Sequence, residues 1–218
     1  MIRYREYGET HWERLVTRRG KLLLPTPRVR FHPTDDEVVR AILTVPIHFA
    51  GDIKRKRGTA VALTVTNLQA LASSATFQSG WSSAWVDDTT TVALDYEVSG
   101  QLTSGTTPTA GSARVYTYSI HADGTTSPDL FSAGTEGTEG AATLHDSEQL
   151  DASIVMLWST SIDTTTNDVY TMPSRSIEQA FGNVPLKWAL YGAHDTVAAL
   201  KATSGSAFYY TPHIQQFT

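Results

Sequence analysis

Apolar and polar residues alternate with a period of two in several stretches of the chain, and this pattern predicts β-strands. The clearest stretch is residues 92–99, where every second side chain is apolar. We expect the apolar set to face a core and the other set to face solvent. The inward set is Val92, Leu94, Tyr96 and Val98, and the outward set is Ala93, Asp95, Glu97 and Ser99.

Further stretches have the same character. Alternation predicts strands at 39–49, 61–65, 115–120, 186–191 and 207–211. Residues 154–158 are apolar on both faces, which indicates a central strand that is buried on both sides.

Glycine, proline and small polar residues separate these strands and predict loops. Loops are expected at 51–58, 99–112, 134–140 and 192–196, together with an Asp-Gly turn at 123–124. Residues 174–181 form the one clear helical pattern. Ser174 or Ser176 would cap its first turn, and Gly182 would end it.

No repeat of 20–50 residues is visible, and strands do not alternate with long helices. The pattern therefore predicts an all-β fold: a β-sandwich, jelly-roll-like, with an extended N-terminal arm and at most one or two short helices. Prolines at 25, 27 and 33 interrupt regular structure near the start. We expect residues 1–52 to form a basic arm plus the first strand, and residues 53–218 to form one sandwich domain.

Composition narrows the class of protein. The 218 residues include no cysteine, which excludes disulfides and thiolate catalysis. No apolar run is long enough to span a membrane, so no membrane partner is expected. The first residues do not form a secretory signal, which indicates synthesis in the cytoplasm.

Charge is distributed unevenly along the chain. Residues 1–60 hold 13 Lys and Arg against 7 Asp and Glu, whereas residues 61–218 hold 4 against 15. A basic arm on an acidic body indicates electrostatic docking, although chance segregation with local ion pairs would give the same count. The candidate docking arm is Arg3, Arg5, Arg14, Arg18, Arg19, Lys21, Arg28 and Arg30.

A second basic cluster lies in the expected loop at 51–58. It consists of Lys54, Arg55, Lys56 and Arg57 between two glycines. The cluster is similar to nucleic-acid and nuclear-import patches, but a solvated turn between strands is the favoured interpretation. We do not expect nucleic acid as a partner.

Candidate catalytic groups do not form a constellation. No Gly-x-Ser-x-Gly elbow occurs, and His194 and Asp195 are adjacent, so on a strand they would point to opposite faces. No histidine spacing predicts a metal site. The sequence thus predicts no enzyme, no cofactor and no metal.

The tryptophans suggest a second type of function. Trp158 and Trp188 lie in apolar strands and are expected in the core. Trp81 and Trp85 lie in a serine-rich stretch, and as surface aromatics they could stack on sugars. A carbohydrate-binding module, such as a receptor-recognition part of a phage tail or of a secreted enzyme, is therefore the alternative function.

The last 45 or so residues contain five short segments that form a pattern: Ala180-Phe181-Gly182, Pro185-Leu186-Lys187-Trp188, Ala198-Ala199-Leu200, Ser204-Gly205-Ser206 and Tyr209-Tyr210. In this order, they resemble the C-terminal segments of small structural proteins of tailed bacteriophages. His194-Asp195 stand where that family usually has an Asn.

The resemblance implies a non-enzymatic virion component, such as a capsid decoration protein or a head or tail accessory protein, made in the host cytoplasm. Its implied partners are the major capsid protein or another virion protein, and further copies of itself. We expect a symmetric homo-oligomer, with a trimer as the first hypothesis.

Overall fold

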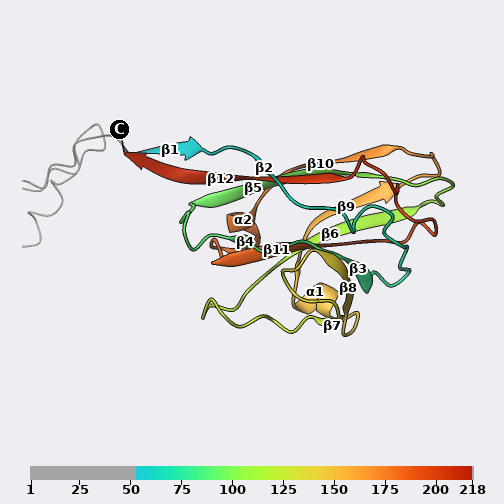
Figure 1. Ribbon diagram of the computed structural model, residues 1–218, viewed down its shortest axis with the longest axis horizontal. Helices are drawn as coiled ribbons and strands as arrows, with labels where there is room; N and C mark the ends of the chain where they lie inside the picture. The colour runs from blue at the N-terminus through green and yellow to red at the C-terminus, as the bar shows by residue number, and fades with distance from the viewer. Residues whose placement is uncertain (1–52, 218) are drawn as a thin grey trace, which may run out of the picture. The chain divides into compact units, whose positions relative to one another are not determined.

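The computed structural model describes residues 53–217, which form two antiparallel β-sheets packed face to face (Figure 1). One sheet has the strand order β1-β12-β5-β10, with β2 also paired to β12. Its strands are β1 (Ile53–Arg57), β2 (Val61–Ala62), β5 (Asp95–Thr103), β10 (Val169–Ser176) and β12 (Ala207–Phe217).

The other sheet has the order β7-β8-β3-β11-β6-β9, with β4 also paired to β11. Its strands are β3 (Ser79–Ser82), β4 (Val86–Asp87), β6 (Gly111–Ser119), β7 (Phe131–Ala133), β8 (Gly140–Leu144), β9 (Val155–Ile162) and β11 (Lys187–His194).

The strand pairs are nested along the chain. The first strands, β1 and β2, pair with the last, β12; β3 and β4 pair with β11; β5 pairs with β10; and β6 pairs with β9. Successive pairs fall in alternate sheets. This arrangement is the jelly-roll topology, so the predicted fold class is confirmed.

Aromatic side chains from both sheets fill the space between them. The rings of Trp81 and Phe208 stack with their centroids 6.0 Å apart, and Trp188 lies 5.6 Å from Tyr96. Large aromatic side chains contribute much buried area, and such pairs add to it through their ring geometry. Trp188 is fully buried and Trp158 is 5% exposed, as predicted.

Strand β11 is apolar on both faces because both faces are covered. Trp188 and Leu190 point into the core between the sheets, whereas Ala189 and Tyr191 point into a second core on the outer face. Residues 120–154, between β6 and β9, form the cover over that outer face. They contribute Leu130, Phe131, Ala142, Leu144, Leu150 and Ile154 to the second core, and they contain helix α1 (Gln149–Ala152).

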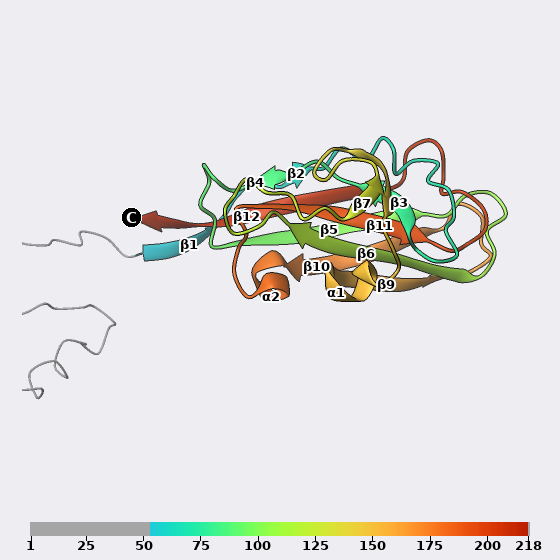
Figure 2. The same ribbon diagram turned by 90° about the horizontal axis from the view of Figure 1, so that it is seen from below.

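Helix α2 (Ile177–Phe181) confirms the predicted helix in a shorter form. The Ser176 side chain accepts a hydrogen bond from the Gln179 amide, and Gly182 ends the helix with a φ of 79°. That left-handed conformation favours glycine because it has no Cβ. Figure 2 shows both helices on the side of the molecule where β9 and β10 lie.

Two predicted strands have different positions in the structure. The strand at 92–99 begins only at Asp95, because Val92 has a φ of 47° and is 74% exposed. The strand at 154–158 is an edge strand rather than a central one, since β9 pairs only with β6. A β-bulge opposite Val115 and Tyr116 interrupts its alternation, and Leu157 and Trp158 both enter the core between the sheets.

Several loop boundaries were also wrong. Strands β5 and β6 extend into the expected loop at 99–112, and β11 continues through His194, so the turn begins at Asp195. The strand expected at 61–65 is only Val61–Ala62. The loop at 134–139 is confirmed.

The predicted N-terminal arm, the strand at 39–49 and the candidate docking residues from Arg3 to Arg30 lie outside the described residues.

Candidate functional site

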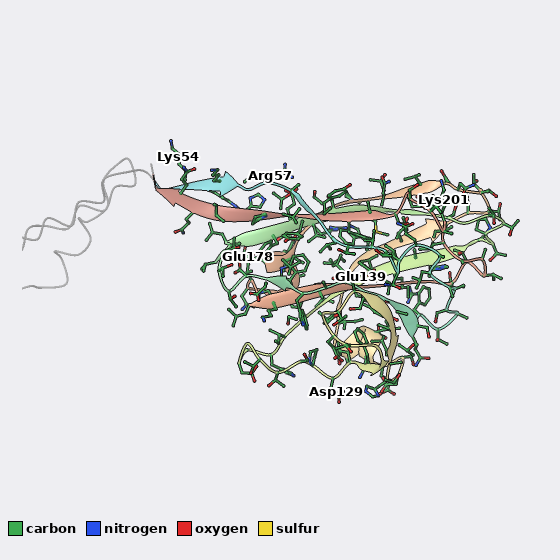
Figure 3. The ribbon with its side chains drawn as sticks, in the orientation of Figure 1. Lys54, Arg57, Asp129, Glu139, Glu178 and Lys201 are labelled. Atoms are coloured by element: carbon green, nitrogen blue, oxygen red, sulfur yellow. The ribbon has the colours of Figure 1, made fainter. Side chains whose placement is uncertain are left out.

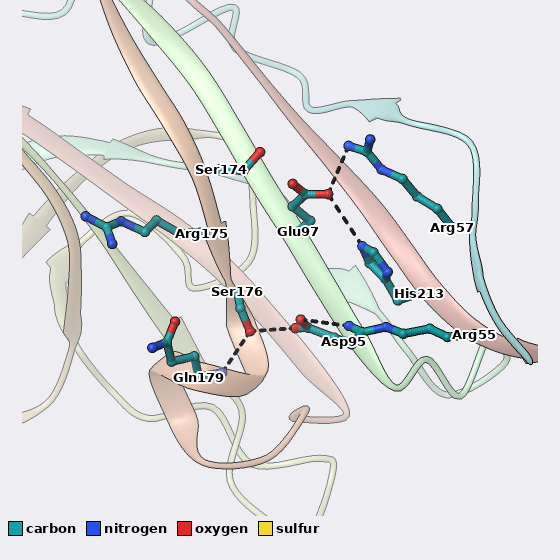
Figure 4. A pocket seen from close by; sticks show the side chains of 9 residues that line it. All are labelled: Arg55, Arg57, Asp95, Glu97, Ser174, Arg175, Ser176, Gln179 and His213. Carbon is teal, nitrogen blue, oxygen red and sulfur yellow. Dashed lines mark hydrogen bonds and ion pairs between the residues drawn. The ribbon is translucent and has the colours of Figure 1, made fainter.

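An open polar groove of about 600 Å³ lies at one end of the five-stranded sheet (Figure 4). Strands β1, β5, β10 and β12 and helix α2 all contribute to it. The lining residues are Arg55, Arg57, Asp95, Glu97, Ser174, Arg175, Ser176, Gln179 and His213.

Strand register explains why these side chains meet. Arg57 lies opposite His213, and His213 lies opposite Asp95 on its other side. Residues that are paired across antiparallel strands point to the same face of a sheet. The next residue along β5, Tyr96, points into the sandwich core, so this row of charged groups stands on the outer face.

Asp95 is the most deeply buried charged group of the groove, at 6% exposure. One carboxylate oxygen accepts hydrogen bonds from the Ser176 hydroxyl and from the Glu178 amide, each 3.0 Å long. The other oxygen lies 3.3 Å from the Arg55 guanidinium. Asp95 therefore connects the first turn of α2 to strand β1.

Glu97 makes the second connection. Its Oε2 atom lies 2.9 Å from the Arg57 guanidinium and 3.4 Å from His213 Nε2. A hydrogen bond from Ser174, with further help from His213 and Arg57, lowers the pKa of the Glu97 carboxyl below its usual value. Both carboxylates of the groove thus hold arginines of β1 from across the intervening strand β12.

The two carboxylates of the groove fasten the basic strand β1 to the sandwich. We call Asp95 and Glu97, together with the side chains that they bind, the clamp. Its two carboxylates are occupied by Arg55, Arg57 and His213. Arg175 is exposed and has no ion-pair partner in the described part of the chain. Arg175 can therefore still donate hydrogen bonds and offer its positive charge, which suits an acidic partner.

The basic cluster at 54–57 is a strand and not the loop that we expected. The glycines on either side indicated a turn, but residues 53–57 pair with β12 along their whole length. Lys54 and Arg57 lie on this strand at the end of the five-stranded layer (Figure 3). The basic character of this strand is thus placed at an edge of the sheet.

The prediction that Trp81 is a surface aromatic is wrong, because its side chain is fully buried. Its serine neighbours are buried as well: Ser82 bonds to the Tyr118 hydroxyl at 2.6 Å, and Ser83 accepts from the Leu190 amide at 2.9 Å. Small residues here allow β3 to pack closely, since a Cβ at Gly80 would lie 2.4 Å from a backbone oxygen of β11.

Trp85 is half buried and is also a poor sugar platform. Its ring packs edge-on against Tyr118 with a centroid distance of 5.2 Å. A Cβ on Gly137 would lie 1.9 Å from the indole nitrogen, so the backbone of the 134–139 loop lies directly on the ring. Trp81 therefore offers no open face for sugar stacking, and Trp85 has one face covered by the loop.

The sequence did not identify Asp95, Glu97, Ser176 and His213 as a site. Asp95 and Glu97 were expected to be solvated outward residues, and His213 had no partner in the sequence. One signal was present: an acidic pair two residues apart on one strand matches an arginine pair with the same spacing on another. The pairing that joins them spans about forty residues and was not visible in local patterns.

His194 is buried, and it lies apart from the groove. Its Nε2 atom lies 2.9 Å from the Leu71 carbonyl, and its Nδ1 atom lies 2.9 Å from the Thr196 hydroxyl. A carbonyl only accepts hydrogen bonds, so Nε2 carries a hydrogen and donates it to Leu71. Burial lowers the pKa of His194 below its ordinary value of 6.5.

We therefore expect acid to destabilise the fold through His194. In the unfolded chain the imidazole takes up a proton near pH 6.5, whereas in the folded protein it does so only at lower pH. The free energy of unfolding should fall as the pH drops below about 6.5. Urea unfolding at a series of pH values measures this fall. The fall should be smaller in His194→Gln, and it should keep its size in His121→Gln, which changes an exposed residue. An equal dependence of the free energy of unfolding on pH in the unaltered protein and in both variants would contradict the assignment.

No group of three or more His, Asp or Glu that could hold a metal ion occurs within residues 53–217. Among the described residues, no helix is long and apolar enough to cross a membrane. No protein-family model matches the chain, and no curated protein matches it at a significant level.

Proposed function

We propose that the protein is a non-enzymatic structural component of a tailed-phage virion, a capsid decoration protein or a head or tail accessory protein. It docks through its basic N-terminal segment and assembles with further copies of itself, with a trimer as the first hypothesis. One observation carries the proposal. The basic strand β1, which directly follows that segment in the chain, is clamped to a jelly-roll body by Asp95 and Glu97.

Charge supports this assignment of roles within the chain. Residues 58–217 hold 4 Lys and Arg against 15 Asp and Glu, so the positive charge of the protein is concentrated in residues 1–57. A rigid body that carries one basic attachment segment suits docking onto an acidic shell. The clamp gives that segment a fixed point of departure from the body.

Part of the C-terminal resemblance lies at packing positions. Trp188 and Leu200 are in the core between the sheets, and Ala180, Phe181 and Tyr210 pack against it, whereas Tyr209 is exposed. These positions agree with a motif that specifies packing and not chemistry. The alternative function, sugar binding, has less support, because Trp81 is buried and Trp85 is covered on one face.

Deletion of residues 1–33 tests the proposal. The truncated protein should fold, with far-UV circular dichroism and a melting temperature close to those of the full chain, but it should no longer sediment with particles. A matched full-length variant, Arg18→Gln with Arg19→Gln and Lys21→Gln, separates charge from length. If the truncated protein sediments with particles at the normal copy number, docking through the arm is wrong.

A further inference from the structure

Strand β1 is an edge strand among the described residues. It pairs with β12 on one side, and no other strand of residues 53–217 pairs with it on the other. Where β1 extends past the end of β5, only β12 supports it, because β12 pairs with β5 only as far as His213. Residues 214–217 of β12 pair with β1 alone, and the two strands project together past β5 (Figure 1).

The register shows which backbone groups this edge presents. The Gly58 amide donates to the Pro212 carbonyl over 2.7 Å. Hydrogen-bonded and non-hydrogen-bonded pairs alternate along an antiparallel ladder. Lys56 and Lys54 therefore bond to β12, whereas the N–H and C=O groups of Arg55 and Arg57 point outward, away from β12.

A two-stranded ribbon is only marginally stable by itself, so a third strand along this edge would gain both hydrogen bonds and support. The outward backbone groups of Arg55 and Arg57 are spaced as the ladder of an added antiparallel or parallel strand requires. The ion pairs to Asp95 and Glu97 hold both residues in place beforehand. A partner strand therefore meets an edge that is already ordered.

Charge selects the partner. Lys54 and Lys56 are exposed, and neither has a carboxylate partner in the described part of the chain. Like charges that lie opposite each other on neighbouring strands are destabilising, whereas opposite charges are favourable. Pairing of β1 with the β1 of a second copy would place cations against cations, so the edge rejects its own copy and favours an acidic strand.

We propose that the outer edge of β1 binds an extended segment of a partner protein that carries Asp or Glu at alternate positions, which joins the five-stranded sheet as an additional strand. The proposal rests on the proposed function for the identification of that partner as a virion protein. The lysines and arginines that protect the edge from unselective pairing also give it its specificity.

Amide hydrogen exchange and peptide binding test the proposal on the full chain. In the free protein, the amides of Arg55 and Arg57 should exchange faster than those of Lys54 and Lys56. The probe is a ten-residue peptide that alternates Glu and Thr, with a Gln-Thr peptide as its neutral control. The Glu peptide should bind about tenfold more tightly, because several cross-strand ion pairs together supply roughly 1.4 kcal/mol. Its binding should slow exchange at Arg55 and Arg57.

Two variants separate strand addition from simple charge attraction. Arg55→Pro removes the ion pair to Asp95 and an outward N–H, but no hydrogen bond to β12. Arg55→Ala removes the same ion pair but keeps the N–H. We expect Arg55→Pro to bind the Glu peptide at least about tenfold more weakly than Arg55→Ala, since the peptide loses a ladder bond.

Three results would overturn the proposal. The first is slow exchange at Arg55 and Arg57 in the free chain, which would show that the edge is already occupied. The second is equal affinity for the Glu and Gln peptides. The third is equal binding by Arg55→Pro and Arg55→Ala, which would show electrostatic association without strand pairing. The assay uses no particles, so its failure would leave docking of the arm on virions untouched, and the reverse also holds.

Discussion

Replacement of Trp188 by alanine is expected to lower the free energy of unfolding by about 3–5 kcal/mol, the usual cost of removing a large aromatic side chain from a core. Trp188 is fully buried at the centre of β11, and its ring contacts Tyr96 and Tyr210 of the opposite sheet. The substitution would leave a cavity between the two sheets, among the aromatic side chains of the core. Guanidinium unfolding followed by circular dichroism measures the loss.

Two further variants sharpen this prediction. Tyr209→Ala changes a 45% exposed aromatic on β12 and should cost about 1 kcal/mol or less. Trp188→Phe keeps an aromatic ring and removes an indole N–H that has no hydrogen-bond partner, so it should cost much less than the alanine variant. If Trp188→Ala were no more harmful than Tyr209→Ala, the packing of the two sheets described here would be wrong.

Replacement of Asp95 by alanine is expected to cost about 2–3 kcal/mol, because hydrogen bonds to a charged, buried group are among the stronger ones and their donors would lose a partner. The donors are the Ser176 hydroxyl, the Glu178 amide and Arg55. The same change releases β1 from the clamp. Amide exchange at Lys54 and Lys56, whose backbone groups bond to β12, should therefore become faster.

Asp87→Ala is the matched control. Asp87 lies 3.2 Å from Lys187 in a partly exposed ion pair and accepts hydrogen bonds from the amide and hydroxyl of its near neighbour Thr89. Because this carboxylate is much more exposed than that of Asp95, its loss should cost only about 1 kcal/mol. If Asp95→Ala unfolded at the same denaturant concentration as Asp87→Ala and left exchange at Lys54 unchanged, Asp95 would not act as the clamp.

The fold class could be predicted from the sequence because its signals are local. Alternation along 115–120 and 186–191 located two strands of the seven-stranded sheet, and Ser176 with Gly182 marked the ends of a helix. The nested pairing of the strands could not be derived in the same way. It joins residues such as Ile53 and Phe217, which are at opposite ends of the described chain.

The alternation of apolar and polar residues predicted burial wrongly where apolar residues are exposed and a charged residue is buried. Val92 and Leu94 continue the apolar pattern of Tyr96 and Val98, yet they are exposed, whereas the charged Asp95 is buried because it caps α2 and binds Arg55. Strand β12 was expected only over 207–211. It continues to Phe217 because it pairs with β1 there.

Only part of the candidate site could be predicted from the sequence, for the same reason. The sequence showed four consecutive cations, but not that Arg55 and Arg57 face two carboxylates about forty residues away in the chain. Small polar neighbours also suggested a surface position for Trp81. In the structure these serines are buried and hydrogen-bonded, which lets the strand that carries Trp81 lie inside the sandwich.

Quantitative mass spectrometry of purified phage particles from cultures that produce the protein tests the central claim most directly. The account predicts that the protein co-purifies with particles at a fixed ratio to the major capsid protein, with a high copy number for a head decoration protein and a few to a few dozen copies for a portal or tail protein. Absence of the protein from particles that contain all other structural components would contradict the account.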